Sequence, residues 1–104
     1  MNKRSEFDDV LAIIHDVVEK IPFNKLLGLT VDALNLDQPS VKLTMRQDLI
    51  GNFIRGSLHG GVISAVLDAM GGLAVMVTIA EHHPHDSAQQ VMHRFARLGT
   101  IDLR

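Results

Sequence analysis

One apolar run, residues 60–80, constrains the fold of this chain more than any other feature of the sequence. Its 21 residues are enough to span a bilayer. However, Asp68 stands near the middle, where a charged side chain costs about 2.5–3.5 kcal/mol on insertion scales. Four glycines and Ser64 weaken a membrane span further. We therefore expect no membrane insertion but a buried central helix, since a helix that is apolar on every face must be enclosed.

Composition narrows the class of protein. The chain has 104 residues, enough for one small domain over residues 1–104, and 46% of them are apolar. A net charge of −2 and an aromatic content of 4%, without Trp or Tyr, argue against nucleic-acid binding. The absence of Cys excludes disulfides and thiolate sites, and it fits a reducing, cytoplasmic location.

The residues before the apolar run predict a helix followed by a hairpin. Apolar residues at three- and four-residue steps predict a helix that ends near Lys20, because a proline follows two residues later. The apolar stripe consists of Val10, Ile13, Ile14, Val17 and Val18. A short turn, ended by Gly28, should follow. Alternation then predicts strands at 29–36 and 41–46, joined by a turn at 37–40 into an antiparallel hairpin.

The remaining segments are less regular. We expect a connector at 47–58 and a polar loop at 82–88, while the sequence of 89–97 is ambiguous. Residues 100–104 alternate like the beginning of a strand. A hairpin and one incipient strand cannot easily cover an apolar helix. The expectation is therefore that the natural domain continues past Arg104 with further strands.

Asp68 is the residue most suggestive of chemistry. Its neighbours are apolar, which argues against the usual solvent-facing position of an aspartate, and an enclosed carboxylate suits a general base. Ser64, Asp68 and Gly72 follow at steps of four, and Gly61 and Gly71 lie close to the same stripe. Because the other side chains of this stripe are small, another backbone or an extended ligand could approach it closely.

The start of the apolar helix offers a second kind of chemistry. Gly60 and Gly61 present backbone amides at a helix N-terminus, where unsatisfied N–H groups and partial positive charge are concentrated. Such amides can polarise a carbonyl group or hold an oxyanion. Equally, the two glycines could serve tight packing and nothing more.

Helix geometry separates these two candidate groups within one chain. His59 and Asp68 are nine residues apart, which is about 13.5 Å along a helix axis, and they face opposite sides. They cannot act on the same carbonyl group. Two antiparallel copies could bring Asp68 of one chain to Gly60 of the other, so catalysis by both ends predicts a dimer with shared sites.

The helix start and the carboxylate belong to one motif. The motif reads Asn52-x-x-x-Gly56-x-Leu58-His59-Gly60-Gly61, followed by Asp68 nine residues after His59. It resembles the hotdog-fold thioesterase superfamily, close to the phenylacetate-pathway type, in which His-Gly-Gly opens the central helix and an acidic residue follows. The resemblance implies an α+β hotdog fold: an antiparallel sheet wrapped around a central apolar helix, an N-terminal helix, and C-terminal strands that are missing here.

The resemblance also implies hydrolysis of an acyl-CoA thioester at a dimer interface, in a homodimer or homotetramer. Asp68 would act as general base or nucleophile, and the amide of Gly61, with that of Gly60, would polarise the thioester carbonyl. Asn52 and His59 would position water or substrate. No cofactor or metal is implied.

Three further residues need separate comment: Asn52, Ser64 and Gly72. Many relatives carry the Asn six residues before the His, where this chain has Phe53, and Asn52 lies seven before. The small-residue stripe makes Ser64 and Gly72 candidate substrate contacts.

Two other functions stay open. An enoyl-CoA hydratase or dehydratase would use His59 with an acid from the partner chain, although the spacing of Asp68 favours hydrolysis. A chain lacking strands could instead be an inactive acyl-CoA-binding or structural dimer.

Two clusters of basic side chains are given the simpler interpretation of a solvated surface. The three histidines within 82–85 surround a proline that breaks helical spacing, so a loop is preferred to a metal site. His93, Arg94 and Arg97 could meet a CoA phosphate, but a solvated basic face is the preferred interpretation.

Overall fold

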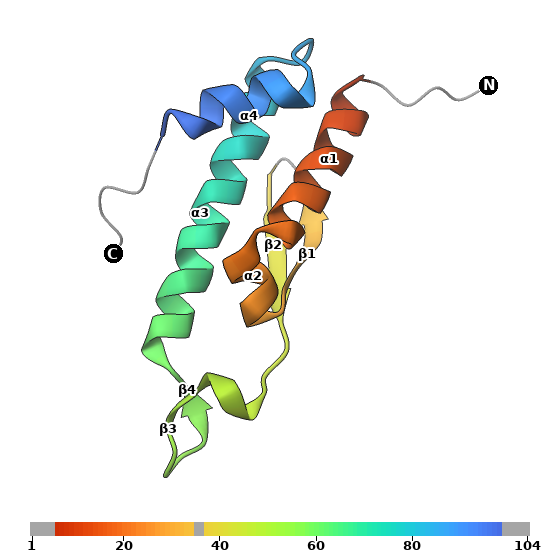
Figure 1. The fold of residues 1–104 in the computed structure, drawn as a ribbon. Coiled ribbons are helices and arrows are strands. Elements are labelled where there is room, and N and C mark those ends of the chain that lie inside the picture. The colour runs from red at the N-terminus through yellow and green to blue at the C-terminus, as the bar shows by residue number, and fades with distance from the viewer. Residues whose placement is uncertain (1–5, 35–36, 99–104) are drawn as a thin grey trace, which may run out of the picture.

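The computed structural model describes residues 6–34 and 37–98. Its elements are α1 (Glu6–Lys20), α2 (Pro22–Leu27), β1 (Leu29–Leu34), β2 (Pro39–Leu43), the 3-10 helix η1 (Gln47–Leu49), β3 (Ile50–Asn52), β4 (Ser57–Leu58), α3 (Gly60–His82) and α4 (Ala88–Ala96). Figure 1 shows α3 as the long axis of the molecule, with α1 beside it and α4 against its C-terminal end. The predicted first helix, short turn and central helix are confirmed.

Side-chain hydrogen bonds fix the corner between α1 and the first strand. The buried side chain of Asn24 donates from Nδ2 to the carbonyl oxygen of Val18 at 3.0 Å, near the end of α1. Gly28, with φ of 78°, ends α2 in the left-handed region that glycine tolerates best. The Arg46 guanidinium donates to the carbonyl oxygens of Leu26 and Leu27, both at 2.6 Å. A cation at the end of α2 also complements the helix dipole.

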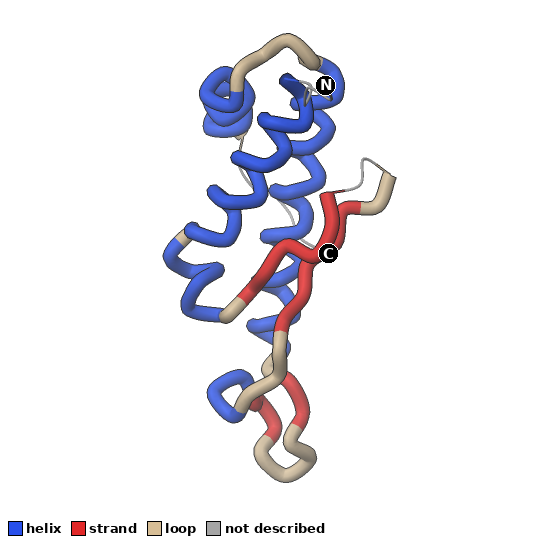
Figure 2. Tube along the Cα trace, turned by 90° about the vertical axis from the view of Figure 1, so that its right-hand side faces the viewer, coloured by secondary structure: helices blue, strands red, loops and turns tan. Residues whose placement is uncertain are grey.

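Strands β1 and β2 form the predicted antiparallel hairpin, with Leu29 opposite Leu43, but β2 runs from Pro39 to Leu43 and not over the predicted residues 41–46. Leu29 and Val31 are buried whereas Thr30 and Asp32 are exposed, so one face of the hairpin packs on the helices. Figure 2 shows this hairpin along one side of the helices. The predicted continuation of the first strand to residue 36, and the predicted strand at 100–104, lie outside the described residues.

The core lies between α1, the hairpin and the second half of α3. It consists of Val10, Ile14, Val18, Leu29, Val31, Leu73, Met76, Val77, Ala80 and Val91. The apolar stripe of α1 is narrower than predicted, because Ile13 and Val17 are exposed. The prediction that α3 is enclosed on every face is wrong for this chain: the buried residues of α3 start at Leu73, and its first half carries none.

Two segments have more structure than the sequence suggested. The connector at 47–58 contains η1 and a small antiparallel sheet of β3 and β4, which projects at the end of the molecule opposite α4 (Figure 2). The ambiguous segment forms α4, whose start is a capping box. Ser87 Oγ accepts from the Gln90 amide at 3.2 Å, and Gln90 Oε1 accepts from the Ser87 amide at 2.7 Å.

Helix α3 also passes the length and composition test for a membrane span, and no other helix among the described residues does. Core helices of soluble proteins pass the same test. In this structure α3 contacts α1, α4 and β2, so at least part of its apolar surface is covered by the chain itself.

Candidate active site

Asp68 lies on the first half of α3 at an apolar cavity of about 230 Å³. The cavity is bounded by the end of α1, α2, α3 and α4, and among the described residues that line it Asp68 carries the one ionisable side chain. The Asp68 side chain is nevertheless exposed. The prediction of an enclosed carboxylate is therefore wrong for the single chain, because Asp68 lies on the half of α3 that precedes its first buried residue, Leu73.

The rest of the small-residue stripe divides into two groups. Gly72 lines the same cavity as Asp68, and a β-carbon at Gly72 would lie 3.4 Å from Cζ of Phe95 on α4. Ser64 is exposed and is not among the residues that line this cavity. Gly71 is exposed, and a β-carbon there would meet nothing within 4 Å. Glycine thus brings α4 close to α3 at residue 72, while the other side of the stripe faces outward.

The start of α3 is capped by His59. Its Nδ1 accepts a hydrogen bond from the Gly61 amide at 2.7 Å. The ring lies so close that a β-carbon at Gly61 would be 2.9 Å from Nδ1. The Gly61 amide, predicted to polarise a carbonyl group, is therefore already occupied by a histidine ring, which would have to rotate away before a substrate oxygen could take its place.

His59 is held from behind by the connector. Its amide donates to the carbonyl oxygen of Leu49, a buried residue, at 2.8 Å. A β-carbon on Gly51 would lie 2.5 Å from Cα of His59, so only glycine fits at this position without moving the backbone. Leu49 and Gly51 together set where α3 begins. Neither residue was recognised from the sequence, because the contact is not local and leaves no periodic pattern.

Asn52 has a structural role in the turn between β3 and β4. Its Oδ1 accepts from the amides of Ile54 and Arg55 at 3.1 and 3.2 Å. Gly56, with φ of 66°, completes the turn. The predicted role of Asn52 in positioning water or substrate stays a prediction, and any such role would have to use the amide nitrogen of the side chain or break these bonds.

The structure brings the predicted residues into two separate groups. Asp68 and Gly72 lie at the apolar cavity, whereas Asn52, His59 and Gly61 lie at the start of α3. Gly61 and Asp68 are seven residues apart, about 10.5 Å along the axis, and differ by about 20° around it. Within one chain they share a side of α3 but do not converge. Among the described residues, no group of three His, Asp or Glu side chains could hold a metal ion.

Sequence comparisons place this arrangement among known proteins. The medium/long-chain acyl-CoA thioesterase YigI of Escherichia coli K12 is 32% identical over 87 residues, and the protein of the same name from Salmonella typhimurium is 33% identical. The alignments cover 84% of this chain, which spans 56% of the length of these curated relatives. No protein-family model matches the chain.

Solved structures decide the family. A crystal structure from Shewanella oneidensis, described as related to the thioesterase superfamily, has a TM-score of 0.87 and 33% identity, covering 98% of this chain and 67% of that one. The chain belongs to the thioesterase superfamily. A second structure from this superfamily has a TM-score of 0.62 and 28% identity over 69% of this chain. The α+β fold with a long central helix is confirmed for this thioesterase-superfamily chain.

Proposed function

We propose that the chain hydrolyses acyl-CoA thioesters to a free acid and CoA. The observation that carries the proposal is Asp68: in a thioesterase-superfamily chain, it is the one ionisable group lining an apolar cavity among the described residues. The carboxylate takes a proton from water, and the water oxygen attacks the thioester carbonyl carbon. The C–S bond then breaks, and the CoA sulfur leaves and takes up the proton.

The outward-facing stripe supports a site shared between two copies. Asp68 cannot reach the Gly61 amide of its own chain, but a second α3, antiparallel to the first, would place the two groups opposite each other. Pairing Asp68 with the partner's Gly61 puts the twofold axis between residues 64 and 65, where Ser64 is exposed. The partner's helix would also enclose Asp68, which would strengthen its electrostatic interactions with the reacting groups. The partner's His59 would have to release the Gly61 amide.

Substitution of Ser64 by Leu tests this pairing. Ser64 is exposed in the single chain, so the fold should survive, whereas two leucines at the crossing of the helices would force them apart. Overpacking of this kind costs about 1–3 kcal/mol. We therefore expect the dissociation constant of the dimer, measured by sedimentation velocity, to rise about tenfold or more. Thr78→Leu is the matched control, since Thr78 is also exposed on α3 but lies far from the crossing. A Ser64→Leu chain that dimerises as tightly as the parent would contradict the pairing.

Apolar surface beside α3 supports medium-length or long acyl chains as substrates, the class for which the YigI relatives are named. A second cavity of about 320 Å³ lies between β2 and the same half of α3, and the described residues that line it are all apolar. Three of its lining residues, Met45, Ile63 and Leu67, are exposed in the single chain. An alkyl chain covering them would gain about 0.8 kcal/mol per buried CH₂ group.

A panel of saturated acyl-CoAs of increasing length tests the activity. Thiol release should be measurable and kcat/KM should rise with chain length until the apolar cavities are filled. A parallel assay with an enoyl-CoA distinguishes a hydratase, which would consume the double bond without releasing thiol. Hydration without thiol release, or CoA-ester binding without turnover, would each refute hydrolysis.

A further inference from the structure

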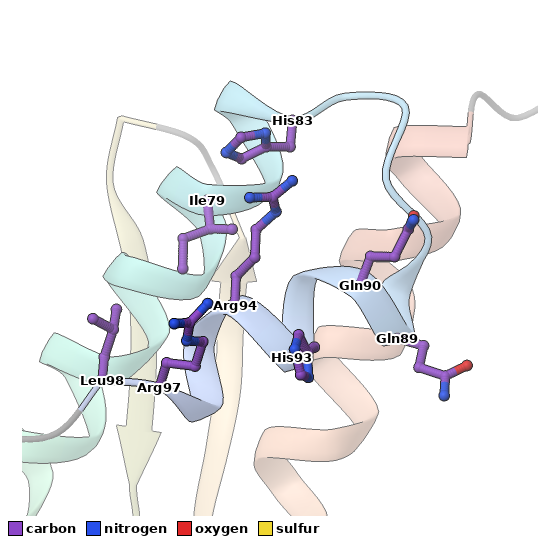
Figure 3. Close-up of a pocket in the computed structure, with 8 residues that line it drawn as sticks. All are labelled: Ile79, His83, Gln89, Gln90, His93, Arg94, Arg97 and Leu98. Carbon is purple, nitrogen blue, oxygen red and sulfur yellow. The ribbon is translucent and has the colours of Figure 1, made fainter.

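A large basic pocket lies where α4 meets the C-terminal end of α3. It has a volume of about 830 Å³, and its lining includes His83, which follows the last residue of α3, His93 and Arg94 from α4, and Arg97, which follows the last residue of α4. Figure 3 shows the Arg94 and Arg97 side chains on the same side of α4, reaching toward α3, with His83 near the tip of Arg94. Four groups that are, or can become, positively charged therefore gather around one hollow in a chain whose net charge is −2.

Within the described part of the chain, the charges of this pocket are only partly neutralised. Arg94 donates from Nε to Asp86 Oδ2 at 2.7 Å, which leaves the two terminal nitrogens of its guanidinium for another acceptor. Within residues 6–34 and 37–98, Arg97 has no acidic partner. Two guanidinium groups three residues apart on one helix repel each other unless an anion lies between them. An arginine pair presents planar, divergent N–H donors that match phosphate oxygens.

The pocket is in line with the candidate active site. Ile79, which lines the basic pocket, is eleven residues after Asp68 on α3, so the two are about 16.5 Å apart along the axis and differ by about 20° around it. Phe95 of α4 lines the cavity of Asp68 and stands between Arg94 and Arg97 in sequence. The surface where α4 meets α3 thus leads from the carboxylate of Asp68, past Gly72 and Phe95, to the arginines at the end of α4.

We propose that this pocket binds the phosphate groups of the CoA ester, while the thioester lies at Asp68. The inference rests on the proposed function, since it assigns the anionic end of the same substrate. Coenzyme A joins its thioester to its phosphates through a long, flexible and uncharged pantetheine arm, which suits the apolar surface between the two sites. His83 and His93 border the pocket and add hydrogen-bond donors to the bound phosphates.

Arg97→Ala is the sharpest variant, because Arg97 supports no ion pair among the described residues. Loss of one charged hydrogen-bond donor should raise KM for an acyl-CoA about tenfold and leave kcat unchanged. The same acyl group on pantetheine, which lacks the phosphates, should be hydrolysed equally by the parent and the variant.

Two further variants serve as controls. Arg97→Lys should recover part of the affinity for the acyl-CoA. Lys42→Ala, which removes an exposed cation from β2, should leave KM unchanged for both the acyl-CoA and the acyl-pantetheine. Equal KM increases for the acyl-CoA and the acyl-pantetheine would overturn the proposal.

Direct binding keeps this inference separate from the activity. CoA titrated into the chain by calorimetry should bind about tenfold more weakly to Arg97→Ala, and the difference should shrink as salt is added. Dephospho-CoA distinguishes the 3′-phosphate from the pyrophosphate, because it retains only the latter. Arg97-dependent binding of CoA without any hydrolysis would retain the phosphate site and refute the proposed function. Hydrolysis with unchanged CoA affinity in Arg97→Ala would refute the phosphate site alone.

Discussion

Replacing Asp68 by Asn should lower kcat for acyl-CoA hydrolysis about 10²- to 10⁴-fold, the range typical of removing a general base or acid. Asparagine keeps the shape of the side chain but cannot accept a proton from water. Since Asp68 is exposed in the single chain, the helical circular dichroism and the melting temperature should change little. The measurement is thiol release at saturating substrate, with substrate binding followed separately.

Glu81→Gln is the matched control for this loss. Glu81 is also an exposed acidic residue on α3, but it lies near the C-terminal end of the helix and outside the cavity of Asp68. Its substitution should leave kcat within a factor of two of the parent, a change too small to involve a catalytic group. Equal activity of Asp68→Asn and Glu81→Gln would remove Asp68 from the mechanism.

Leu73→Ala should lower the free energy of unfolding strongly. The Leu73 side chain is only 1% exposed and belongs to the core cluster that joins α1, the hairpin and α3. Truncation of a buried leucine to alanine costs about 2–5 kcal/mol, because transfer free energy is lost and a cavity is left. For a domain of this size the melting temperature should fall by roughly 10 °C or more. Urea unfolding followed by circular dichroism gives the free energy directly.

Leu67→Ala provides the comparison on the same helix. Leu67 is 51% exposed, so the same chemical change removes much less buried surface and should cost well under half as much free energy. Equal losses for Leu67→Ala and Leu73→Ala would mean that the first half of α3 is as deeply packed as the second, contrary to the structure of the single chain.

This contrast between the halves of α3 also marks the limit of prediction from sequence. The apolar run identified the central helix and its start correctly, because an uninterrupted stretch of this kind has few alternatives. The pattern could not reveal which faces the chain itself covers, since α3 is apolar nearly all round. For that reason Asp68 was expected to be enclosed, whereas the structure leaves it exposed at the edge of a cavity.

Local signals explain the other successes and misses. The hairpin followed from alternation and turn residues, and the capping box of Ser87 and Gln90 was visible in the sequence although its helix was left ambiguous. In contrast, the contact of Gly51 with His59 depends on the pairing of β3 with β4, and that of Phe95 with Gly72 joins two different helices. Contacts of this kind depend on the fold and have no sequence period, so the support for the helix start and the cavity wall formed by α4 could not be anticipated.

The central claim, that Asp68 of one chain works with the helix start of another, is tested most directly by mixing two inactive variants. Asp68→Asn removes the carboxylate. Gly61→Pro removes the amide proton in the first turn of α3, where proline is tolerated, and displaces the His59 ring. A mixed dimer of the two variants carries one intact site, so coexpression in equal amounts should restore about a quarter of the parental kcat if dimers form at random. No recovery of activity, although mixed dimers are isolated, would contradict a shared site.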